Sequence, residues 1–148
     1  MKPTEKWRDA MRHKLISDEG EKLKPYRCPA GKWTIGVGRN IEDNGISTAT
    51  SRQMLDEDID TAISAACNIF TEEYFQTIHP LRQQAIINML FNLGETRFRK
   101  FEHTIALIKM GDWKAAKVAA TKSLWYTQVK ARGDRVVSLF DLKDTYPS

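Results

Sequence analysis

The chain has little cysteine and no long hydrophobic run. Its 148 residues include two cysteines, too few for the disulfide framework of a small secreted protein. No stretch approaches the roughly 18 consecutive apolar residues that a membrane-spanning helix needs, so we expect no stable membrane insertion. The charged N-terminus also lacks the apolar region of a secretory signal, so any work outside the cytoplasm would need another route across the membrane.

The sequence also lacks the motifs of several large enzyme classes. It contains no GxSxG, HExxH or P-loop pattern. Gly36-Val37-Gly38 begins like a dinucleotide-binding fingerprint, but Ile41 stands where the third glycine belongs. The three histidines are too far apart for metal-ligand spacing. We therefore expect neither a metal nor a nucleotide cofactor.

What the chain does have is an ordinary globular composition with unevenly distributed charge. It is 41% apolar and 28% charged with a net charge of +4, which is typical of one soluble domain with a buried core. Residues 1–79 carry a net charge of −2 and residues 80–148 a net charge of +6. A basic half suits an anionic partner such as nucleic acid, an acidic membrane surface or a bacterial wall, although basic surfaces also simply aid solubility.

The hydrophobic pattern predicts a largely helical chain with one small β region. Trp33, Ile35 and Val37 alternate within a Gly- and Pro-punctuated stretch, which predicts a hairpin between residues 22 and 41. Residues 42–47 have turn chemistry, and Thr50 with Gln53 forms a capping box that opens a long helix. The helices are expected at about residues 3–19, 50–70, 81–93, 103–110, 112–121 and 132–142.

These elements predict a single α+β domain built from two lobes. The small lobe covers about residues 15–50 and contains the hairpin. A connecting helix leads to a larger all-helical lobe of about residues 70–148, on which the opening helix 3–19 is expected to pack. A cleft between two lobes is where a ligand site is expected.

Glu19 is a candidate proton donor. It ends the opening helix immediately before Gly20 and the hairpin, where a carboxyl partly removed from water can donate a proton near neutral pH. Eight residues separate Glu19 from Cys28, and five more separate Cys28 from Thr34. The hairpin would fold Cys28 and Thr34 back towards Glu19.

The spacing of Glu19, Cys28 and Thr34 is accompanied by further motifs. Pro25-Tyr26 and the run from Thr34 to Gly38 lie around it, and similar stretches follow at residues 91–96, 111–116 and 122–126. In this combination the chain resembles the phage-type lysozymes of glycoside hydrolase family 24, over about residues 15–45 and 81–142. The family pattern is Glu, eight residues, Asp or Cys, five residues, and Thr.

The resemblance implies a lysozyme-like fold and, without a cofactor, hydrolysis of the β-1,4 bond between N-acetylmuramic acid and N-acetylglucosamine in peptidoglycan. Glu19 would be the general acid, and Thr34 would orient the attacking water. In members with Asp at the second position, the carboxylate activates this water with inversion. An ordinary thiol is mostly protonated at neutral pH, so Cys28 could activate water, stabilise the cation, attack it, or only pack.

The resemblance also implies substrate-binding positions. Phe91 and Thr104 match positions that contact sugar, and Asn40 matches a position where a backbone contact is expected. Arg132 matches an arginine that approaches the catalytic glutamate. Phe91 could instead pack in the core, and Arg132 could cap the preceding turn. Arg39 stands where the family often has His, and its role is open.

As a biological role, the resemblance implies a monomeric endolysin that lyses bacteria from within. The enzyme would wait in the host cytoplasm and reach the periplasm and wall through a separate holin. Its partner would be peptidoglycan rather than nucleic acid, because no recognition helix or stacking motif organises the basic residues. Two alternatives stay open: a lytic transglycosylase that leaves an anhydro product, and a catalytically degenerate wall-binding or virion protein.

Overall fold

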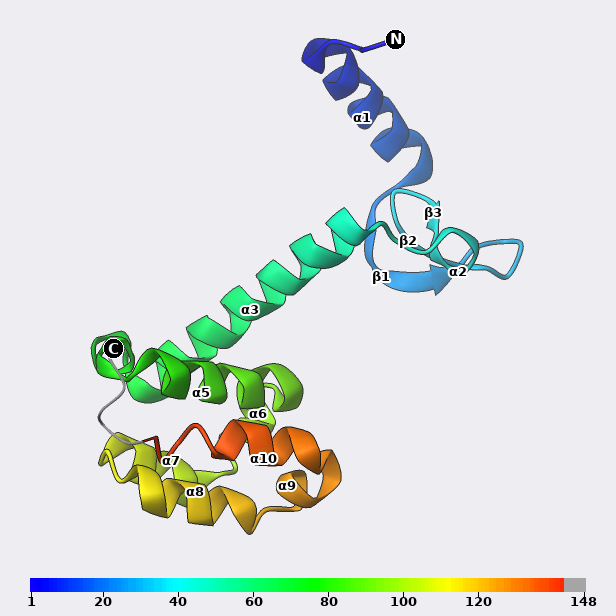
Figure 1. Cartoon of the computed structure of the whole chain (residues 1–148). Helices are drawn as coiled ribbons and strands as arrows, with labels where there is room; N and C mark the ends of the chain where they lie inside the picture. Colours follow the sequence, from blue (N-terminus) through cyan, green and yellow to red (C-terminus); the bar gives the residue numbers. More distant parts are fainter. Residues whose placement is uncertain (143–148) are drawn as a thin grey trace. The chain divides into compact units, whose positions relative to one another are not determined.

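The computed structural model describes residues 1–142 and divides the chain into two compact units. The first unit ends at Arg52 and the second begins at Gln53. Figure 1 follows the order of the elements within each unit. The fold is α+β as expected, because one small antiparallel sheet is accompanied by helices. The packing of the opening helix on the helical lobe and the cleft between lobes stay predictions.

The first unit contains a helix and a three-stranded antiparallel sheet. The helix α1 spans Glu5–Glu19, and its first turn is capped by Thr4, whose hydroxyl accepts a hydrogen bond from the Trp7 amide. Gly20 ends it with a φ of 73°, a left-handed backbone that favours glycine. The strands are β1 (Lys22–Arg27), β2 (Trp33–Gly36) and β3 (Arg39–Asn40), in the order β1-β2-β3.

The register of the sheet places Thr34 in its centre. Thr34 lies opposite Tyr26 on β1 and opposite Asn40 on β3, and it is 3% exposed. The predicted hairpin is therefore confirmed. The prediction that Val37 continues the strand is wrong, because the chain turns at Val37 and Gly38 before β3 pairs back onto β2.

Two further boundaries differ from the sequence expectation. Residues 41–44 form a short helix, α2 (Ile41–Asn44), because the Asn40 side chain accepts a hydrogen bond from the Asp43 amide and caps it. The long helix α3 (Thr48–Phe70) begins before the expected Thr50. Ser47 provides the cap, since its hydroxyl accepts from the Thr50 amide at 3.1 Å.

The regular elements among the described residues of the second unit are all helices joined by short turns. Gly94 ends the central helix as expected, with a φ of 77°, and Asp112 caps the helix that follows Gly111. Ser123 caps an additional helix that the pattern did not predict. After α3 come α4 (Glu72–Thr77), α5 (Pro80–Leu93), α6 (Glu95–Phe98), α7 (Glu102–Lys109), α8 (Trp113–Thr121), α9 (Leu124–Val129) and α10 (Ala131–Val137), the last ending earlier than expected.

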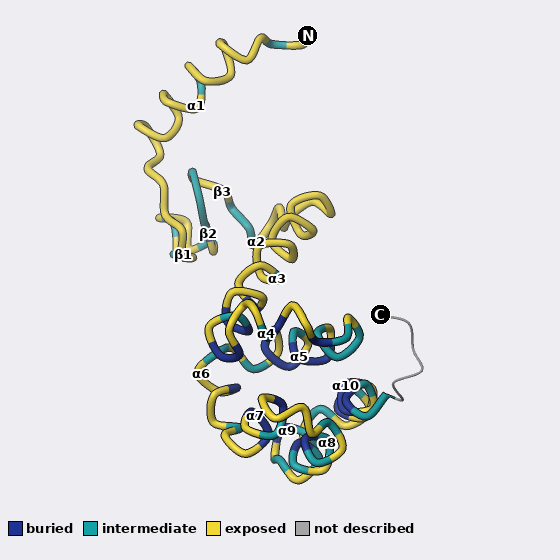
Figure 2. Tube along the Cα trace, turned by 90° about the vertical axis from the view of Figure 1, so that its left-hand side faces the viewer, coloured by how far each residue is buried: buried dark blue, intermediate teal, exposed yellow. Residues whose placement is uncertain are grey.

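The hydrophobic core of the described chain lies in this second unit. Figure 2 shows the buried residues along its helices, whereas α1 buries none of its residues. Burying each large apolar side chain contributes roughly 1.5–3 kcal/mol, so α5 and the helices around it supply most of the stability. The largest fully buried side chains are Phe98, Phe140, Ile86, Met89, Ile108, Val136 and Val137.

The outer surface of this unit carries charge of both signs. The acidic residues on the first half of α3, among them Asp56, Glu57 and Asp60, are exposed, which confirms the interpretation of this run as a solvated face.

Within residues 1–142, no helix combines the length and apolar character needed to cross a membrane.

Candidate active site

Glu19 lies at the point where α1 ends and the sheet begins. Its side chain is exposed on the first unit, and its carboxyl group rests against Gly38 in the turn between β2 and β3. A Cβ atom added to Gly38 would lie 2.8 Å from Oε2 of Glu19 and 3.2 Å from its Cδ. The helix end and the sheet turn therefore meet at the carboxyl group that the sequence predicts to be the proton donor.

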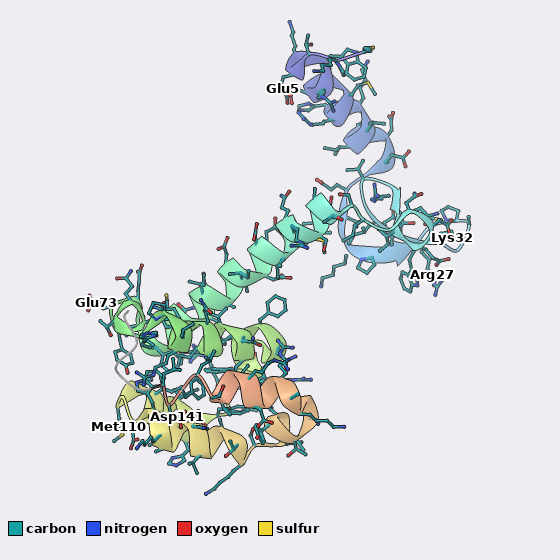
Figure 3. All side chains as sticks on the ribbon, in the orientation of Figure 1. Glu5, Arg27, Lys32, Glu73, Met110 and Asp141 are labelled. Carbon is teal, nitrogen blue, oxygen red and sulfur yellow. The ribbon has the colours of Figure 1, made fainter. Side chains whose placement is uncertain are left out.

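Cys28 lies in the loop that joins β1 to β2. Its amide donates to the Lys32 carbonyl at 3.0 Å, and its own carbonyl accepts from the Gly31 amide at 2.8 Å. Arg27 braces the loop from the strand, since its guanidinium donates to the Gly31 carbonyl at 2.9 Å. Figure 3 shows Arg27 and Lys32 at this end of the sheet. The thiol is half-buried inside a tight, hydrogen-bonded turn.

The loop changes the acidity of the thiol. Hydrogen bonding from the Lys32 backbone lowers the pKa of Cys28 below its ordinary value, with further lowering by the Ala30 backbone and the Thr34 side chain. Partial burial opposes this effect. Backbone amides directed at a sulfur stabilise its negative form, so the thiolate fraction at neutral pH is larger than for a free cysteine.

Thr34 is packed directly behind this loop. Its hydroxyl donates to the Lys32 carbonyl at 2.9 Å and also interacts with the Cys28 thiol. Because a hydroxyl has one proton, Thr34 can donate to only one acceptor at a time. The structure therefore places Thr34 beside Cys28, as the hairpin predicted, in a position to change its hydrogen-bond partner.

Asn40 and Arg39 hold the far side of the sheet. Asn40 is the neighbour of Thr34 across the β2–β3 pair, and its side chain is occupied by Asp43, to which its amide donates at 2.9 Å. The Arg39 guanidinium donates to the Gly45 carbonyl at 3.1 Å through Nε and at 2.9 Å through a terminal nitrogen. Arg39 thus bridges β3 to the loop at Gly45, and a contact of its guanidinium with the wall stays a prediction.

Phe91 and Arg132 line one groove on the second unit, with a volume of about 480 Å³. Phe91 is 45% exposed, so the alternative of a core-packed Phe91 is wrong. Arg132 donates from Nε to the Asn88 side chain on α5 at 2.9 Å. The remaining wall of the groove is mainly apolar and includes Leu55 and Ile59 of α3.

Thr104 lies at a second hollow of this unit, with a volume of about 670 Å³. It is 3% exposed and, with Thr34, is one of two buried polar side chains among the described residues. Trp125 lines the same hollow and donates to the Asn92 side chain at 2.9 Å. Arg97, Lys100 and Lys122 outnumber the acidic Glu102 in its lining and give the hollow a net basic character.

Comparison with known proteins decides the family of the chain. The model of the phage lysozyme family matches residues 17–141. The chain belongs to the phage lysozyme family. It is accordingly a lysozyme-like peptidoglycan hydrolase of the glycoside hydrolase type.

Several curated proteins are similar over much of this chain. "Probable T4-type lysozyme 2" of Dictyostelium discoideum is 28% identical over 159 aligned residues, which cover 89% of this chain and 94% of that protein. An "Endolysin" of Acyrthosiphon pisum secondary endosymbiont phage 1 is 33% identical, over 79% of this chain and 77% of that protein. The "Pre-baseplate central spike protein Gp5" of Enterobacteria phage T4 is 27% identical over 88% of this chain but only 27% of its own length.

The structure also shows three residues that contact residues of the candidate site and that the sequence did not single out. Gly38 was noted only as part of a motif, yet it contacts the Glu19 carboxyl group. Asn88 holds Arg132, and Asn92 holds Trp125. The two asparagines lie four residues apart on α5, and this helical spacing was the signal that could have found them. Among residues 1–142, no group of three or more His, Cys, Asp or Glu side chains could hold a metal ion.

Proposed function

We propose that this enzyme hydrolyses the β-1,4 bond between N-acetylmuramic acid and N-acetylglucosamine in peptidoglycan. The observation that carries the proposal is the grouping of Glu19, Cys28 and Thr34 within one compact unit, in the order and spacing of the family. The loop that holds Cys28 lowers the pKa of its thiol. A proton donor and a proton acceptor are the two groups that this hydrolysis needs.

In the proposed reaction, Glu19 donates its proton to the glycosidic oxygen as the bond from the sugar C1 atom to that oxygen breaks. A water molecule attacks C1 and loses a proton to the Cys28 thiolate, while Thr34 orients that water. The products are two sugar ends with one water molecule added. Afterwards Glu19 is a carboxylate and Cys28 a thiol, and exchange with solvent restores both.

Three residues of the second unit are proposed to bind the glycan or its attached groups. The exposed ring of Phe91 provides an apolar surface for a sugar face. Arg132 is held by Asn88 in a fixed orientation, which favours recognition of an acceptor group. Thr104 lies beside a basic hollow, which suits anionic groups of the wall. On the first unit, the Asn40 side chain is engaged with Asp43, so its backbone is the part proposed to contact substrate.

The proposed biological role is that of a phage endolysin acting as a monomer. Similarity to a protein named endolysin supports this role. The enzyme would accumulate in the host cytoplasm and reach the wall once a separate holin has opened the membrane. Peptidoglycan is its proposed partner, without nucleic acid and without insertion into the membrane.

A second candidate role is that of a particle-borne enzyme. Similarity to a phage spike protein supports it, because the match covers most of this chain and about a quarter of that longer protein. The chemistry would be the same, but the enzyme would act from outside the cell. Fractionating lysates of infected cells separates the two roles: an endolysin is found free, whereas a spike component is found with particles.

The test of the proposed reaction is mass spectrometry of muropeptides released from purified peptidoglycan in oxygen-18-labelled water. The wild type is expected to release reducing ends that contain the label, and Glu19→Gln is expected to release at least about a hundredfold less. Glu21→Gln is the matched control, since Glu21 is an exposed carboxyl two residues further along the chain. Anhydro ends without label would instead show a transglycosylase, and a lack of products from the wild type would show a binding protein.

A further inference from the structure

The turn between β2 and β3 forms the surface on which the Glu19 carboxyl group rests. At Gly38 an added Cβ would lie 2.8 Å from Oε2, 3.2 Å from Cδ and 3.4 Å from Cβ of Glu19. The first of these distances is shorter than carbon and oxygen atoms tolerate without a bond. The carboxyl therefore occupies its observed position because residue 38 has no side chain.

The backbone at Gly38 is fixed from both sides. Before it, Ile35 pairs with Arg39 across the hairpin. After it, the Arg39 guanidinium donates twice to the Gly45 carbonyl, at 3.1 and 2.9 Å. Residue 38 itself has a φ of 65°, a conformation that glycine adopts easily. An atom added at residue 38 would therefore meet a turn held by these contacts, and the Glu19 carboxyl group or the turn would have to shift.

Gly36, the last residue of β2 before this turn, provides an internal comparison. Its φ is 67°, almost equal to that of Gly38, but a Cβ added there would meet nothing within 4 Å. Glycine is therefore required at residue 36 for its backbone alone. At residue 38 glycine meets two requirements, a left-handed backbone and the space for the Glu19 carboxyl group.

We propose that Gly38 is a positioning residue that sets the location of the Glu19 carboxyl group for proton donation. This inference rests on the proposed function, in which Glu19 is the general acid. A general acid acts only within hydrogen-bond distance of the atom that it protonates, and a displacement of about 1 Å can cost on the order of a hundredfold in rate. Glu19 is exposed and its side chain has several rotatable bonds, so the carboxyl group could occupy many positions, and its contact with the turn at Gly38 limits them.

The experiment compares Gly38→Ala with Gly36→Ala in purified enzyme acting on peptidoglycan. Both variants place alanine in a left-handed backbone, so their losses of stability should be similar. Only Gly38→Ala displaces the carboxyl group. We expect kcat of Gly38→Ala to fall about 10- to 100-fold below that of Gly36→Ala, with KM values within about twofold, because substrate binding does not depend on the position of this proton donor.

A second measurement reports on the carboxyl group without relying on activity. In protein labelled with carbon-13 at glutamate carboxyl carbons, the Glu19 resonance, assigned with Glu19→Gln, should shift in Gly38→Ala and stay in place in Gly36→Ala. Should alanine prevent folding, Gly38→Asn and Gly36→Asn repeat the comparison, since asparagine tolerates a left-handed backbone better.

The outcomes distinguish this inference from the proposed function. Equal kcat values in the two variants, with an unmoved Glu19 resonance, would overturn the positioning role while leaving the hydrolase intact. A wild type without hydrolytic activity would overturn the proposed function, and the Glu19 resonance would still decide whether Gly38 sets the position of the carboxyl group.

Discussion

Among the candidate site residues, Cys28 has the surroundings that bear most directly on the proposed reaction. It stands where other family members have a carboxylate, and the loop around it compensates in part for the weaker acidity of sulfur. The largest effect is a hydrogen bond with the Lys32 backbone, which lowers the pKa of the Cys28 thiol. In the proposed reaction, the side chain and its loop together, rather than the side chain alone, would replace the aspartate found at this position elsewhere in the family.

This environment predicts a specific pH dependence. If the thiolate accepts the proton of water, kcat/KM rises as the pH increases through the pKa of Cys28, which lies below its ordinary value of 9.0. Cys28→Asp should remain active and show this rise at lower pH, since an aspartate ionises near pH 4. Cys28→Ser should lose about a hundredfold or more, because serine provides no comparable base.

The measurement is kcat/KM against pH for the three proteins on the same peptidoglycan preparation. Cys67→Ser is the matched control, since Cys67 packs against the core of the second unit. Wild-type activity and an unchanged profile in Cys28→Ser would show that Cys28 only packs and that Glu19 and Thr34 perform the chemistry.

Among the helices of the second unit, α5 carries side chains that bond to residues near the C-terminal end of the described chain. Its apolar residues supply part of the core, while Asn88 and Asn92, one helical turn apart, accept hydrogen bonds from Arg132 and Trp125. Near its first turn, Arg82 donates to the carbonyls of Phe140 and Leu142 at 2.9 and 2.8 Å. This helix thus organises both the packing and the candidate substrate-binding surface of its unit.

Removing the Arg82 guanidinium should destabilise the second unit. Its two charge-assisted hydrogen bonds end on backbone carbonyls, and its guanidinium carbon lies 4.9 Å from the centre of the Trp113 ring. We expect Arg82→Met to lower the free energy of unfolding by about 1.5–3 kcal/mol, measured by urea denaturation. Arg82→Lys should lose less, because it keeps a cation near Trp113.

The control for this change is Arg99→Met, which removes an exposed arginine whose salt bridge to Glu95 spans 2.9 Å on the surface. Such a pair contributes little. Equal losses of stability in Arg82→Met and Arg99→Met would contradict the anchoring role of Arg82.

For the whole molecule, the distribution of charge matters more than the net charge. The second half of the sequence is basic, but the exposed face of α3 carries acidic residues such as Asp56 and Glu57. Basic residues gather instead around the hollow that contains Thr104, where Arg97, Lys100 and Lys122 lie. An anionic wall polymer should therefore be attracted to a part of the surface rather than to all of it.

Neutralising this cluster should weaken wall binding in a salt-dependent way. In the Glu19→Gln background, which avoids degradation of the wall, Lys100→Gln with Lys122→Gln should reduce binding several-fold at low salt. The difference should shrink towards 1 M salt, where charges are screened within about 3 Å. Lys109→Gln with Lys114→Gln is the matched control, because both lysines are exposed and neither lines this hollow. Equal binding by the two double variants at low salt would contradict the proposal.

The local structure near Glu19 could be predicted well from the sequence, because short-range rules govern it. Gly20 ends the helix, the turn after Cys28 reverses the chain, and Thr34 therefore returns beside Cys28. The helix boundaries that were predicted wrongly lie where more than one residue could cap a helix. Ser47 caps α3 in place of the expected Thr50, and Asn40 caps a short helix where a loop was expected. Several polar residues were available in each stretch, and which of them caps depends on backbone geometry.

By itself, the sequence determined the α+β class, the helix ends marked by Gly20 and Gly94, and the family spacing of Glu19, Cys28 and Thr34. These features depend on residues close together in the chain or on side-chain type. Only the tertiary structure decided that Gly38 contacts Glu19, that backbone amides lower the pKa of Cys28, and that Phe91 is exposed. Those outcomes depend on distances between separate segments, which are fixed only when the segments pack.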